Sequence, residues 1–341
     1  MIINLISDTV TKPCNKMLDF MMNSNVGDDV FKEDPTVNEL EKMLAQMFGK
    51  ESALFFPSGT MANQTAIKIH TEPGDQLICD KYAHVYNYEG GGVSFNSGVS
   101  CKLIDGHRGM FTNEQVINSI NPPDFYHSPK TSLVCVENTT NKGGGACWDI
   151  NELTKIRKTC KKHNLFYHLD GARIWNAMVK TNTKPIQYGK IFDSISICLS
   201  KGLGCPVGSV LLGSNEFINK AIRIRKVLGG GMRQAGYLAA CGIYALNNNV
   251  DRLKEDHLKA LEIEKLLSKQ PYIKKVEEVE TNILIFQLKS NYDSNIFLKK
   301  MLESGIKLIS MGDNKLRIVT HKDYSDKMHL NFIEIIRNLQ I

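Results

Sequence analysis

Short apolar runs alternate along the chain with stretches in which apolar residues recur every three or four positions. The short runs are mostly apolar and predict buried strands at 52–56, 77–80, 102–104, 132–136, 165–169, 194–199 and 209–212. The periodic stretches predict helices at 15–23, 37–48, 61–70, 151–163, 216–226 and 235–246. Strands and helices that alternate in this way predict an α/β fold with a mostly parallel sheet.

The pattern changes after residue 246. A long, charged amphipathic helix is expected over 251–269, followed by strands at 282–288, 306–311 and 316–320 and helices at 294–304 and 326–339. A run of this kind makes a compact α+β unit of normal domain size. We therefore expect a large domain over residues 1–246, with an N-terminal arm, and a small C-terminal domain over residues 247–341.

One helix start carries a recognisable signal. Thr36 precedes the helix predicted at 37–48, and Glu39 follows it three residues later. A hydroxyl and a carboxyl at this spacing form a capping box, so Thr36 is the expected N-cap.

Composition narrows the class of protein. Among 341 residues, 42 basic and 36 acidic side chains give a formal charge of +6, and no basic run is interleaved with aromatic residues. A nucleic-acid partner is therefore not expected. No apolar stretch reaches the length of a membrane span, and none of the nine cysteines forms a C-x-x-C pair. We expect a soluble, cytoplasmic protein with no metal site and with cysteines that act as small core residues.

Lys201 and Asp170 are the candidates for covalent chemistry. Lys201 follows the strand at 194–199 in a turn that contains Gly202 and Gly204, and Asp170 follows the strand at 165–169. Most lysines lie on solvated helix faces, whereas Lys201 directly follows a strand that is expected to be buried. A lysine that binds an aldehyde and a carboxylate that keeps a pyridine nitrogen protonated are what a pyridoxal phosphate site requires.

Other residues could complete such a site, although each has a plainer interpretation. Ser58, Gly59 and Thr60 open a helix and could hold a phosphate group, but Ser and Thr are equally good helix caps. His84 follows a strand end and could lie over a flat ring, whereas an isolated histidine such as His127 says little. Arg317 lies in a strand between β-branched residues and therefore needs a carboxylate, from the protein or from a substrate.

Six motifs carry a resemblance to a known family. They are SDTVT, GDDVFKEDPTVNELE, FFPSGTMANQ, HLDGARIWNA, SKGLGCPVGS and LGGGMRQAG, in this order along nearly the whole chain. The chain resembles the low-specificity L-threonine aldolases, pyridoxal phosphate enzymes with the fold type I of aspartate aminotransferase. The resemblance implies a large domain with a seven-stranded, mostly parallel sheet, and a retro-aldol cleavage of L-threonine or L-allo-threonine to glycine and acetaldehyde.

The resemblance also implies roles for individual residues. Lys201 would bind the cofactor aldehyde, with Asp170 at the pyridine nitrogen and His84 stacked on the ring. The phosphate would be held by Ser58, Gly59 and Thr60, and by Lys226 and Arg233 of a neighbouring subunit. The substrate carboxylate would be held by Ser7, Arg173 and Arg317, with Arg173 also close to the cofactor, and the hydroxyl would lie near His84 and His127. A shared site implies a homo-oligomer, in this family a tetramer built as a dimer of dimers.

Three positions depart from the family pattern, and two other functions stay open. Phe31 and Lys32 replace a common tyrosine and glycine, and Thr140 stands where many relatives have histidine. These changes put fine specificity in question more than the reaction. A β-eliminating lyase of the same fold would share Lys201 and Asp170, and a non-catalytic protein of this fold is the other alternative. A nicotinamide enzyme is not expected, because no G-x-G-x-x-G turn follows the first strand.

Overall fold

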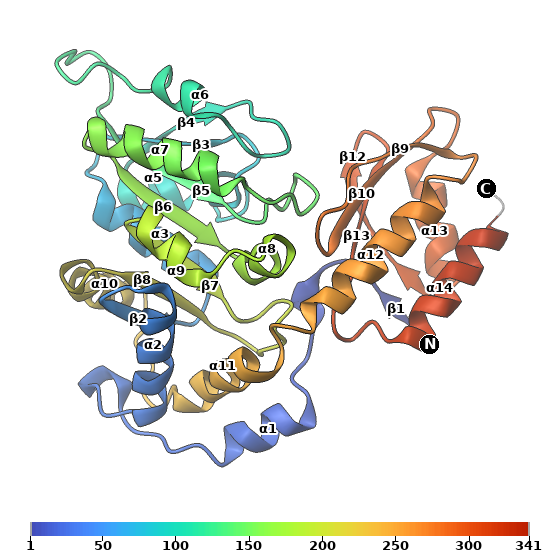
Figure 1. Ribbon diagram of the computed structural model, residues 1–341, viewed down its shortest axis with the longest axis horizontal. Coiled ribbons are helices and arrows are strands. Elements are labelled where there is room, and N and C mark those ends of the chain that lie inside the picture. Colours follow the sequence, from blue (N-terminus) through green and yellow to red (C-terminus); the bar gives the residue numbers. More distant parts are fainter. Residues whose placement is uncertain (1, 340–341) are drawn as a thin grey trace.

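A seven-stranded sheet forms the centre of the larger domain in the computed structural model, which describes residues 2–339 (Figure 1). In spatial order its strands are β2 (Ser52–Phe56), β8 (Ser209–Gly213), β7 (Ser194–Cys198), β6 (Phe166–Gly171), β5 (Thr131–Glu137), β3 (Gln76–Asp80) and β4 (Ser100–Ile104). Strand β8 is antiparallel to both of its neighbours, and the other pairs are parallel. The predicted mostly parallel sheet is confirmed.

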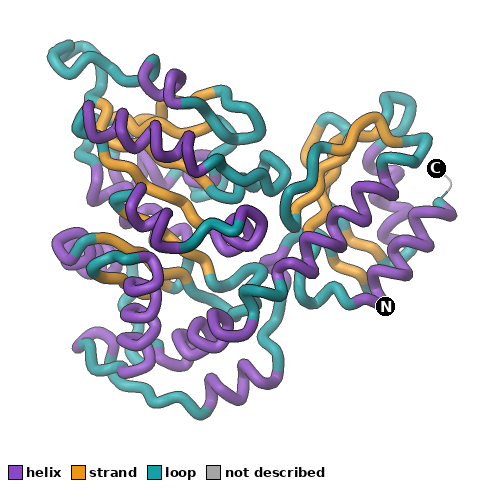
Figure 2. Tube along the Cα trace, in the orientation of Figure 1, coloured by secondary structure: helices purple, strands orange, loops and turns teal. Residues whose placement is uncertain are grey.

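Helices cover both faces of this sheet, as the purple and orange layers of Figure 2 show. On one face, Leu54 and Phe56 pack with α3 (Gly59–His70) and α10 (Asn215–Val227). On the other face, Phe55 packs with α2 (Pro35–Phe48). Because both faces are buried over most of the sheet, most strands are apolar runs that lack an apolar–polar alternation, whereas β4 is largely exposed.

The remaining helical segments of the larger domain lie between these strands or after them. They are α1 (Asn15–Met22), α4 (His84–Asn87), α5 (Gly92–Ser97), α6 (Asn113–Ile117), α7 (Ile150–Lys162), α8 (Ile174–Thr181), α9 (Pro185–Ile191) and α11 (Gly236–Asn248), with 3₁₀ turns at Asp8–Val10 and Asp29–Phe31.

Asp34, and not Thr36, is the N-cap of α2. Its Oδ1 accepts hydrogen bonds from the backbone N–H groups of Thr36 (3.1 Å) and Val37 (3.0 Å). Pro35 occupies the first helical position, where its missing N–H costs nothing and its fixed φ suits the helix. The capping-box expectation for Thr36 was therefore wrong, because the preceding Asp-Pro pair starts the helix earlier.

The smaller domain is built on a four-stranded antiparallel sheet, seen at the right of Figure 1. Its strands, in spatial order, are β12 (Ile309–Gly312), β13 (Lys315–Val319), β10 (Ile283–Leu288) and β9 (Ile273–Val276). Its helices are α12 (Leu253–Leu267), which leads out of the larger domain, α13 (Ser294–Glu303) and α14 (Asp326–Asn338). Apolar side chains from all three helices join this sheet in one core.

The strand expected at 306–311 is divided in two. Its first part, β11 (Ile306–Lys307), leaves the four-stranded sheet and pairs in parallel with β1 (Ile3–Asn4) from the N-terminal arm. Ile3 and Leu5 are completely buried in the core of the smaller domain. The arm therefore joins the C-terminal domain, while the boundary at residue 246 stays a prediction.

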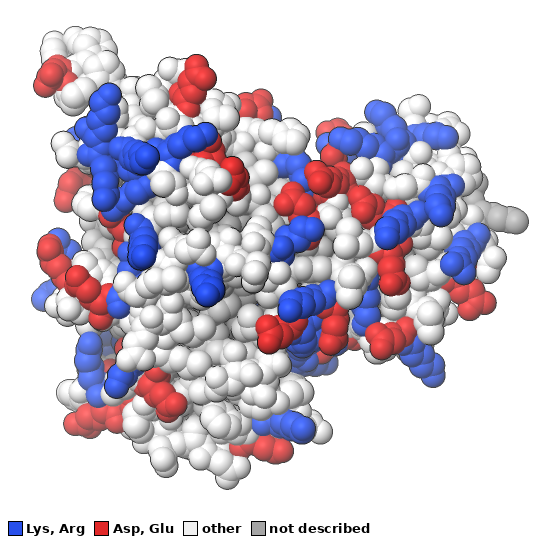
Figure 3. Space-filling model, viewed as in Figure 1, with Lys and Arg blue, Asp and Glu red and all other residues white. Residues whose placement is uncertain are grey.

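Charge is distributed without a dominant sign on the face shown in Figure 3, where basic and acidic side chains are interspersed over both domains. Within residues 2–339 we find no helical segment with the length and hydropathy of a transmembrane span. All nine cysteines are free thiols, and six of them are buried.

Gly189 of α9 offers a test of how α9 packs on α2. A Cβ atom at this position would lie 1.6 Å from the backbone oxygen of Phe48. Gly189→Ala must therefore shift a backbone, and we expect it to lower the free energy of unfolding by about 1–3 kcal/mol or more. Urea denaturation measures the change, with Lys190→Ala at the exposed neighbouring position as the control. Equal stability of the two variants would contradict this packing.

Candidate active site

A cavity of about 420 Å³ opens at the carboxyl ends of β5, β6 and β7. This is the edge at which parallel α/β sheets commonly bind their ligands. Both domains and the N-terminal arm contribute to its wall. The lining residues are Ser7, Thr9, His84, Tyr88, Glu137, Asn141, Lys142, Ala172, Arg173, Lys201, Ile309, Ser310, Met311 and Arg317.

Lys201 lies in the turn that follows β7, next to the start of α3. Its Nζ is 3.5 Å from Sγ of Cys198, and its backbone oxygen accepts a hydrogen bond from Oγ1 of Thr11 (2.8 Å). A Cβ atom at Gly59 would lie 2.6 Å from the same sulfur, so only glycine allows this approach. The structure thus brings the lysine and the Ser58-Gly59-Thr60 turn together.

Asp170 has one carboxylate oxygen that no side chain or backbone group satisfies. The residue is 2% exposed, and its Oδ1 accepts the backbone N–H of Ala172 at 3.1 Å. Its Oδ2 is buried and has no hydrogen-bond partner among residues 2–339. Leaving a buried acceptor unpaired is costly, so a donor from a bound molecule fits here. The protonated pyridine nitrogen of pyridoxal phosphate is such a donor.

The turn at Ser58 forms the N-terminus of α3. Oγ of Ser58 accepts the backbone N–H of Met61 at 3.2 Å, so the helix-cap interpretation is confirmed. Ser58 and Thr60 are exposed, and the free N–H groups of the first turn can bind an anion as well. The phosphate role of this turn stays a prediction.

The two arginines of the cavity differ in their partners. Arg173 is buried and donates from Nε and Nη2 to the two oxygens of Asp8, at 2.8 and 2.7 Å. Arg317 donates from Nη1 to Oδ1 of Asn141 (2.7 Å) and from Nη2 to the backbone oxygen of Ile6 (2.9 Å). Its buried Nε has no partner, and no carboxylate of the described chain pairs with it.

The pKa shifts of these groups follow from the same pairing. Burial alone would raise the pKa of Asp8, but the charge and hydrogen bonds of Arg173 hold it well below its usual range. Burial and the neighbouring charge of Arg173 lower the pKa of Arg317. A cation that is disfavoured in this way becomes more stable when an anion binds beside it. The cavity is therefore suited to a ligand with a carboxylate.

His84 lies among three buried carboxylates. Burial alone would lower its pKa, but the hydrogen bond to Glu89 and the charges of Asp170, Glu89 and Glu137 raise it. Glu137 accepts the backbone N–H groups of His84 (3.1 Å) and Asn141 (2.9 Å), and burial together with Asp170 raises its pKa to about 7. This wall of the cavity can therefore exchange protons near neutral pH.

The side chains of His84, Glu89 and Asp170 also meet the spacing of a metal site, since one ligand atom of each lies within 4.8 Å of the others. Nδ1 of His84 and Oε1 of Glu89 are 3.0 Å apart and form a hydrogen bond. That bond explains the closeness of the imidazole and the carboxylate without an ion.

Three predicted site residues lie away from this cavity. His127 is exposed in the loop that precedes β5, and this loop lies at the opposite edge of the sheet. Lys226 and Arg233 are exposed near the end of α10, where Arg233 pairs with Asp28 at 2.8 Å. Neither of them lines the cavity, and the roles of all three residues stay predictions.

The three departures from the family pattern lie outside the cavity lining. Phe31 is 69% exposed, with the guanidinium of Arg233 5.7 Å from its ring centroid. Lys32 has a left-handed backbone with φ of 60°, a conformation that glycine adopts more easily. Thr140 is buried and would touch a Cβ atom at Gly143, so it packs beneath a turn.

Sequence reasoning missed four acidic or amide side chains of the site. Asp8 holds Arg173, Asn141 holds Arg317, Glu137 lines the cavity and Glu89 binds His84. Asp8 lies within the SDTVT motif, and Glu137 ends a strand next to that of Asp170, which were usable signals. Glu89 had no local signal.

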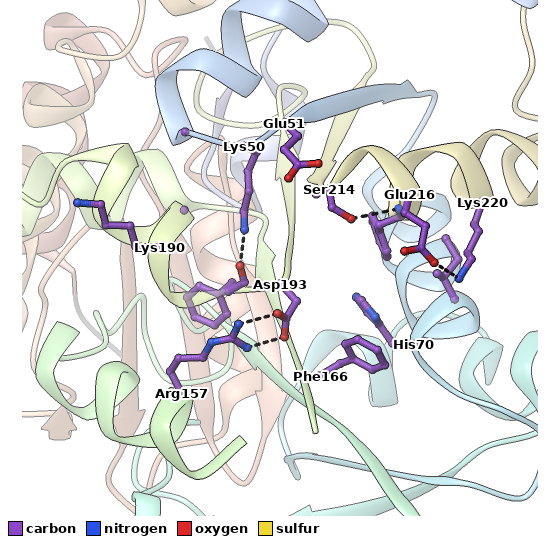
Figure 4. Close-up of a pocket in the computed structure, with 16 residues that line it drawn as sticks. Lys50, Glu51, His70, Arg157, Phe166, Lys190, Asp193, Ser214, Glu216 and Lys220 are labelled. Carbon is purple, nitrogen blue, oxygen red and sulfur yellow. Dashed lines mark hydrogen bonds and ion pairs between the residues drawn. The ribbon is translucent and has the colours of Figure 1, made fainter. Parts of the chain in front are cut away.

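A second cavity of about 400 Å³ lies at the opposite edge of the sheet (Figure 4). Arg157 forms two hydrogen bonds with Asp193 there (2.6 and 2.7 Å), and Lys220 pairs with Glu216 at 2.8 Å. His70 is stacked between two phenylalanine rings, and burial together with the charges of Lys220 and Lys50 lowers its pKa to about 3. Since these acids and bases pair with one another, the Lys201 cavity is the better candidate.

Comparisons with known proteins show which family the chain resembles. The beta-eliminating lyase family matches residues 4–291. Low-specificity L-threonine aldolase 1 of Arabidopsis thaliana is 40% identical over 327 residues, which cover 94% of this chain and 91% of that protein. The low specificity L-threonine aldolase of Escherichia coli K12 is 46% identical over 256 residues, covering 75% and 76%. A solved threonine aldolase of Leishmania major shares the fold, with a TM-score of 0.84, 20% identity and coverage of 98% of each chain.

The ion pair between Asp8 and Arg173 predicts a large stability effect. Asp8→Asn leaves the buried guanidinium without its counter-charge, which typically lowers the free energy of unfolding by about 3–5 kcal/mol. Because the pKa of Asp8 is lower in the folded state, its contribution is complete above the unfolded pKa of about 3.9 and is lost as the pH falls further.

Urea unfolding of the wild type and of Asp8→Asn, at neutral and at acidic pH, measures the difference between their free energies of unfolding. We expect this difference to become smaller in acid. Glu216→Gln removes an exposed ion pair and is the matched control, for which we expect no measurable change. If Asp8→Asn were as stable as this control, the pair would not support the fold.

Proposed function

The chain belongs to the beta-eliminating lyase family and, within it, to the low-specificity L-threonine aldolases, and on that premise we propose that it uses pyridoxal phosphate to cleave L-threonine and L-allo-threonine. The products are glycine and acetaldehyde. One observation carries the proposal: Asp170 at the end of β6 and Lys201 after the adjacent β7 lie on the same side of the sheet as the cavity, and a buried oxygen of Asp170 lacks a donor among residues 2–339.

Six residues of one chain would hold the cofactor. Lys201 would bind its aldehyde carbon, and Asp170 would accept a hydrogen bond from its pyridine nitrogen. Ser58, Gly59 and Thr60 would bind its phosphate, and His84 would lie against its ring. When bound, pyridoxal phosphate supplies an electron sink for the bond that breaks at the substrate's Cα.

A phosphate group also gains from cations beside it. Lys226 and Arg233 are exposed in a single chain, and we assign them to the phosphate of a neighbouring subunit. This assignment requires a homo-oligomer with shared active sites, which we take to be a tetramer.

Arg317 and Ser7 orient the substrate through its carboxylate. The planar guanidinium of Arg317 can make two parallel hydrogen bonds to a carboxylate, and its Nε is free to make one of them. Arg173 has committed two of its nitrogens to Asp8 and adds positive charge nearby. Holding the carboxylate determines which bond at Cα faces the cofactor, and therefore which bond breaks.

His84 removes the proton of the β-hydroxyl group, directly or through a water molecule. Loss of this proton turns the C–O bond into the carbonyl of acetaldehyde as the Cα–Cβ bond breaks, and a proton returned to Cα completes glycine. A positioned base of this kind typically contributes about 10²–10⁴-fold to the rate. We assign the second histidine at the hydroxyl, His127, to another subunit.

The proposed cellular location follows from cysteine chemistry. Nine free thiols, one of them exposed, suit a reducing compartment, so we place the protein in the cytoplasm.

The defining experiment is a visible absorbance spectrum of the purified protein before and after addition of L-threonine, with acetaldehyde assayed in parallel. A cofactor band that borohydride bleaches, together with acetaldehyde and glycine, supports the proposal. A band without cleavage would favour a β-eliminating activity, which cysteine conjugates test. No band after addition of pyridoxal phosphate would reject the cofactor assignment.

Lys201→Ala should abolish acetaldehyde release, because the remaining residues cannot bind the cofactor covalently. After borohydride treatment, mass spectrometry should find the cofactor on the Lys201 peptide of the wild type and none on this variant. Lys190→Ala, which removes a lysine of the second cavity, should leave both results unchanged. Appreciable turnover by Lys201→Ala would reject its assignment.

Arg317→Leu should raise KM for threonine by about 10- to 100-fold, the usual contribution of hydrogen bonds to a charged group. The cofactor band should persist, because Arg317 does not hold the cofactor. Arg317→Lys keeps the positive charge but lacks the planar guanidinium, so its KM should lie between those of the wild type and of Arg317→Leu. An unchanged KM in the leucine variant would exclude the carboxylate role.

A further inference from the structure

A buried carboxylate lies behind His84 and does not line the cavity. Glu89 is 6% exposed, and its Oε1 is 3.0 Å from Nδ1 of His84. The same carboxylate accepts hydrogen bonds from Nδ2 of Asn63 (2.9 Å) and Nε2 of Gln64 (2.6 Å). Both oxygens of Glu89 therefore accept hydrogen bonds from amide groups, in addition to the contact with the imidazole.

The hydrogen bonds of Asn63 determine the direction of this network. Oδ1 of Asn63 accepts from Oγ of Ser196 (2.5 Å) and is 3.1 Å from Nε2 of His168, so its Nδ2 must face Glu89. A flipped amide would place oxygen against a carboxylate. Since an ionised carboxylate only accepts hydrogen bonds, Nδ1 of His84 must carry a hydrogen.

The hydrogen-bond network continues through the core of the larger domain, with each group donating toward Glu89. With Nε2 of His168 donating to Asn63, its Nδ1 accepts from the hydroxyl of Ser194 (2.8 Å). That hydroxyl accepts in turn from Nε2 of His70 (2.7 Å) at the wall of the second cavity. Burial lowers the pKa of His168 to about 3, so this ring stays neutral and keeps its tautomer.

We infer that Glu89 is a positioning residue that holds His84 as the tautomer with hydrogen on Nδ1, leaving the lone pair of Nε2 for the substrate's hydroxyl proton. The inference rests on the proposed function for the identity of that proton. A carboxylate behind an imidazole has the same effect in serine hydrolases, where it sets the tautomer and stabilises the imidazolium.

Other charges face His84 from every element around it. The acidic groups are Glu89, Glu137 at the end of β5 and Asp170 at the end of β6. The cationic groups that line the same cavity are Lys142, Arg173, Lys201 and Arg317. Because Glu89 alone of the acids bonds to the imidazole ring, removing its charge should lower the pKa of His84 although two acids remain.

The tautomer can be measured without any turnover. Solid-state ¹⁵N NMR of the histidine-labelled wild-type protein, with and without added pyridoxal phosphate, distinguishes protonated from bare ring nitrogens, and His84→Gln identifies the signals of His84. Above the pKa of His84 we expect hydrogen on Nδ1 and a bare Nε2. Hydrogen on Nε2 would overturn the inference, and so would a spectrum that changes on chelation, which would indicate a metal ion on these ligands.

Glu89→Gln then tests the consequence for catalysis. The amide keeps the shape and loses the charge, so kcat should fall about 10- to 100-fold with little change in KM. The acid limb of the kcat/KM profile should move to lower pH, and the NMR titration of His84 should move with it. If kcat fell by the same factor but the acid limb of the kcat/KM profile did not move, Glu89 would have a structural role only. That result would overturn the inference.

Glu262→Gln is the matched control. It removes a similar contact, 2.7 Å between Oε2 of Glu262 and Nε2 of His329, in the smaller domain. We expect it to leave kcat, KM and the acid limb unchanged. If the wild type shows no aldolase activity at all, the proposed function fails, while the tautomer measurement still decides the role of Glu89.

Discussion

The carboxylate of Asp8 is the point at which the three parts of the active site meet. It comes from the N-terminal arm, pairs with Arg173 after β6 of the large sheet, and accepts a hydrogen bond from Asn282 of the smaller domain at 3.2 Å. A buried charge must be paired, so this contact leaves the arm little freedom. The same arm adds β1 to the smaller domain and holds the backbone of Lys201 through Thr11. The arm therefore helps to set the position of Arg317 relative to Lys201, together with contacts that join the domains directly, such as those of Arg108 with Glu280 and of Thr281 with the backbone oxygen of Gly145.

In the proposed function, helix α3 would link cofactor binding to proton transfer. Its first turn presents Ser58, Gly59 and Thr60, and the second presents Asn63 and Gln64 to Glu89. Buried amide side chains destabilise a fold when they lack hydrogen-bond partners, but Asn63 and Gln64 both donate to Glu89. Since the phosphate turn and the support of His84 belong to one rigid element, a shift of the helix would disturb both together.

Local patterns predicted the fold well because most strands of the large sheet are buried on both faces. The strand at 52–56 agrees with β2 residue for residue, and Lys201 and Asp170 were found from strand ends alone. What local patterns could not predict depends on distant partners: Arg173 lies 165 residues from Asp8, and β11 leaves its sheet because β1 offers a parallel partner. His127 shows a further limit, because a neighbouring chain cannot be placed from one sequence.

The two arginines of the cavity differ in what they can bind, because one is already paired with a carboxylate of the chain and the other is not. Arg173 and Arg317 carry the same charge in the same cavity, yet Asp8 forms an ion pair with the first and no carboxylate of the described chain pairs with the second. An incoming carboxylate therefore gains most from Arg317, which belongs to β13 of the smaller domain, whereas Lys201 belongs to the larger one. A substrate held by both residues connects the two domains. In the proposed function, the free energy of carboxylate binding would then also stabilise the domain arrangement in which His84 acts on the hydroxyl group.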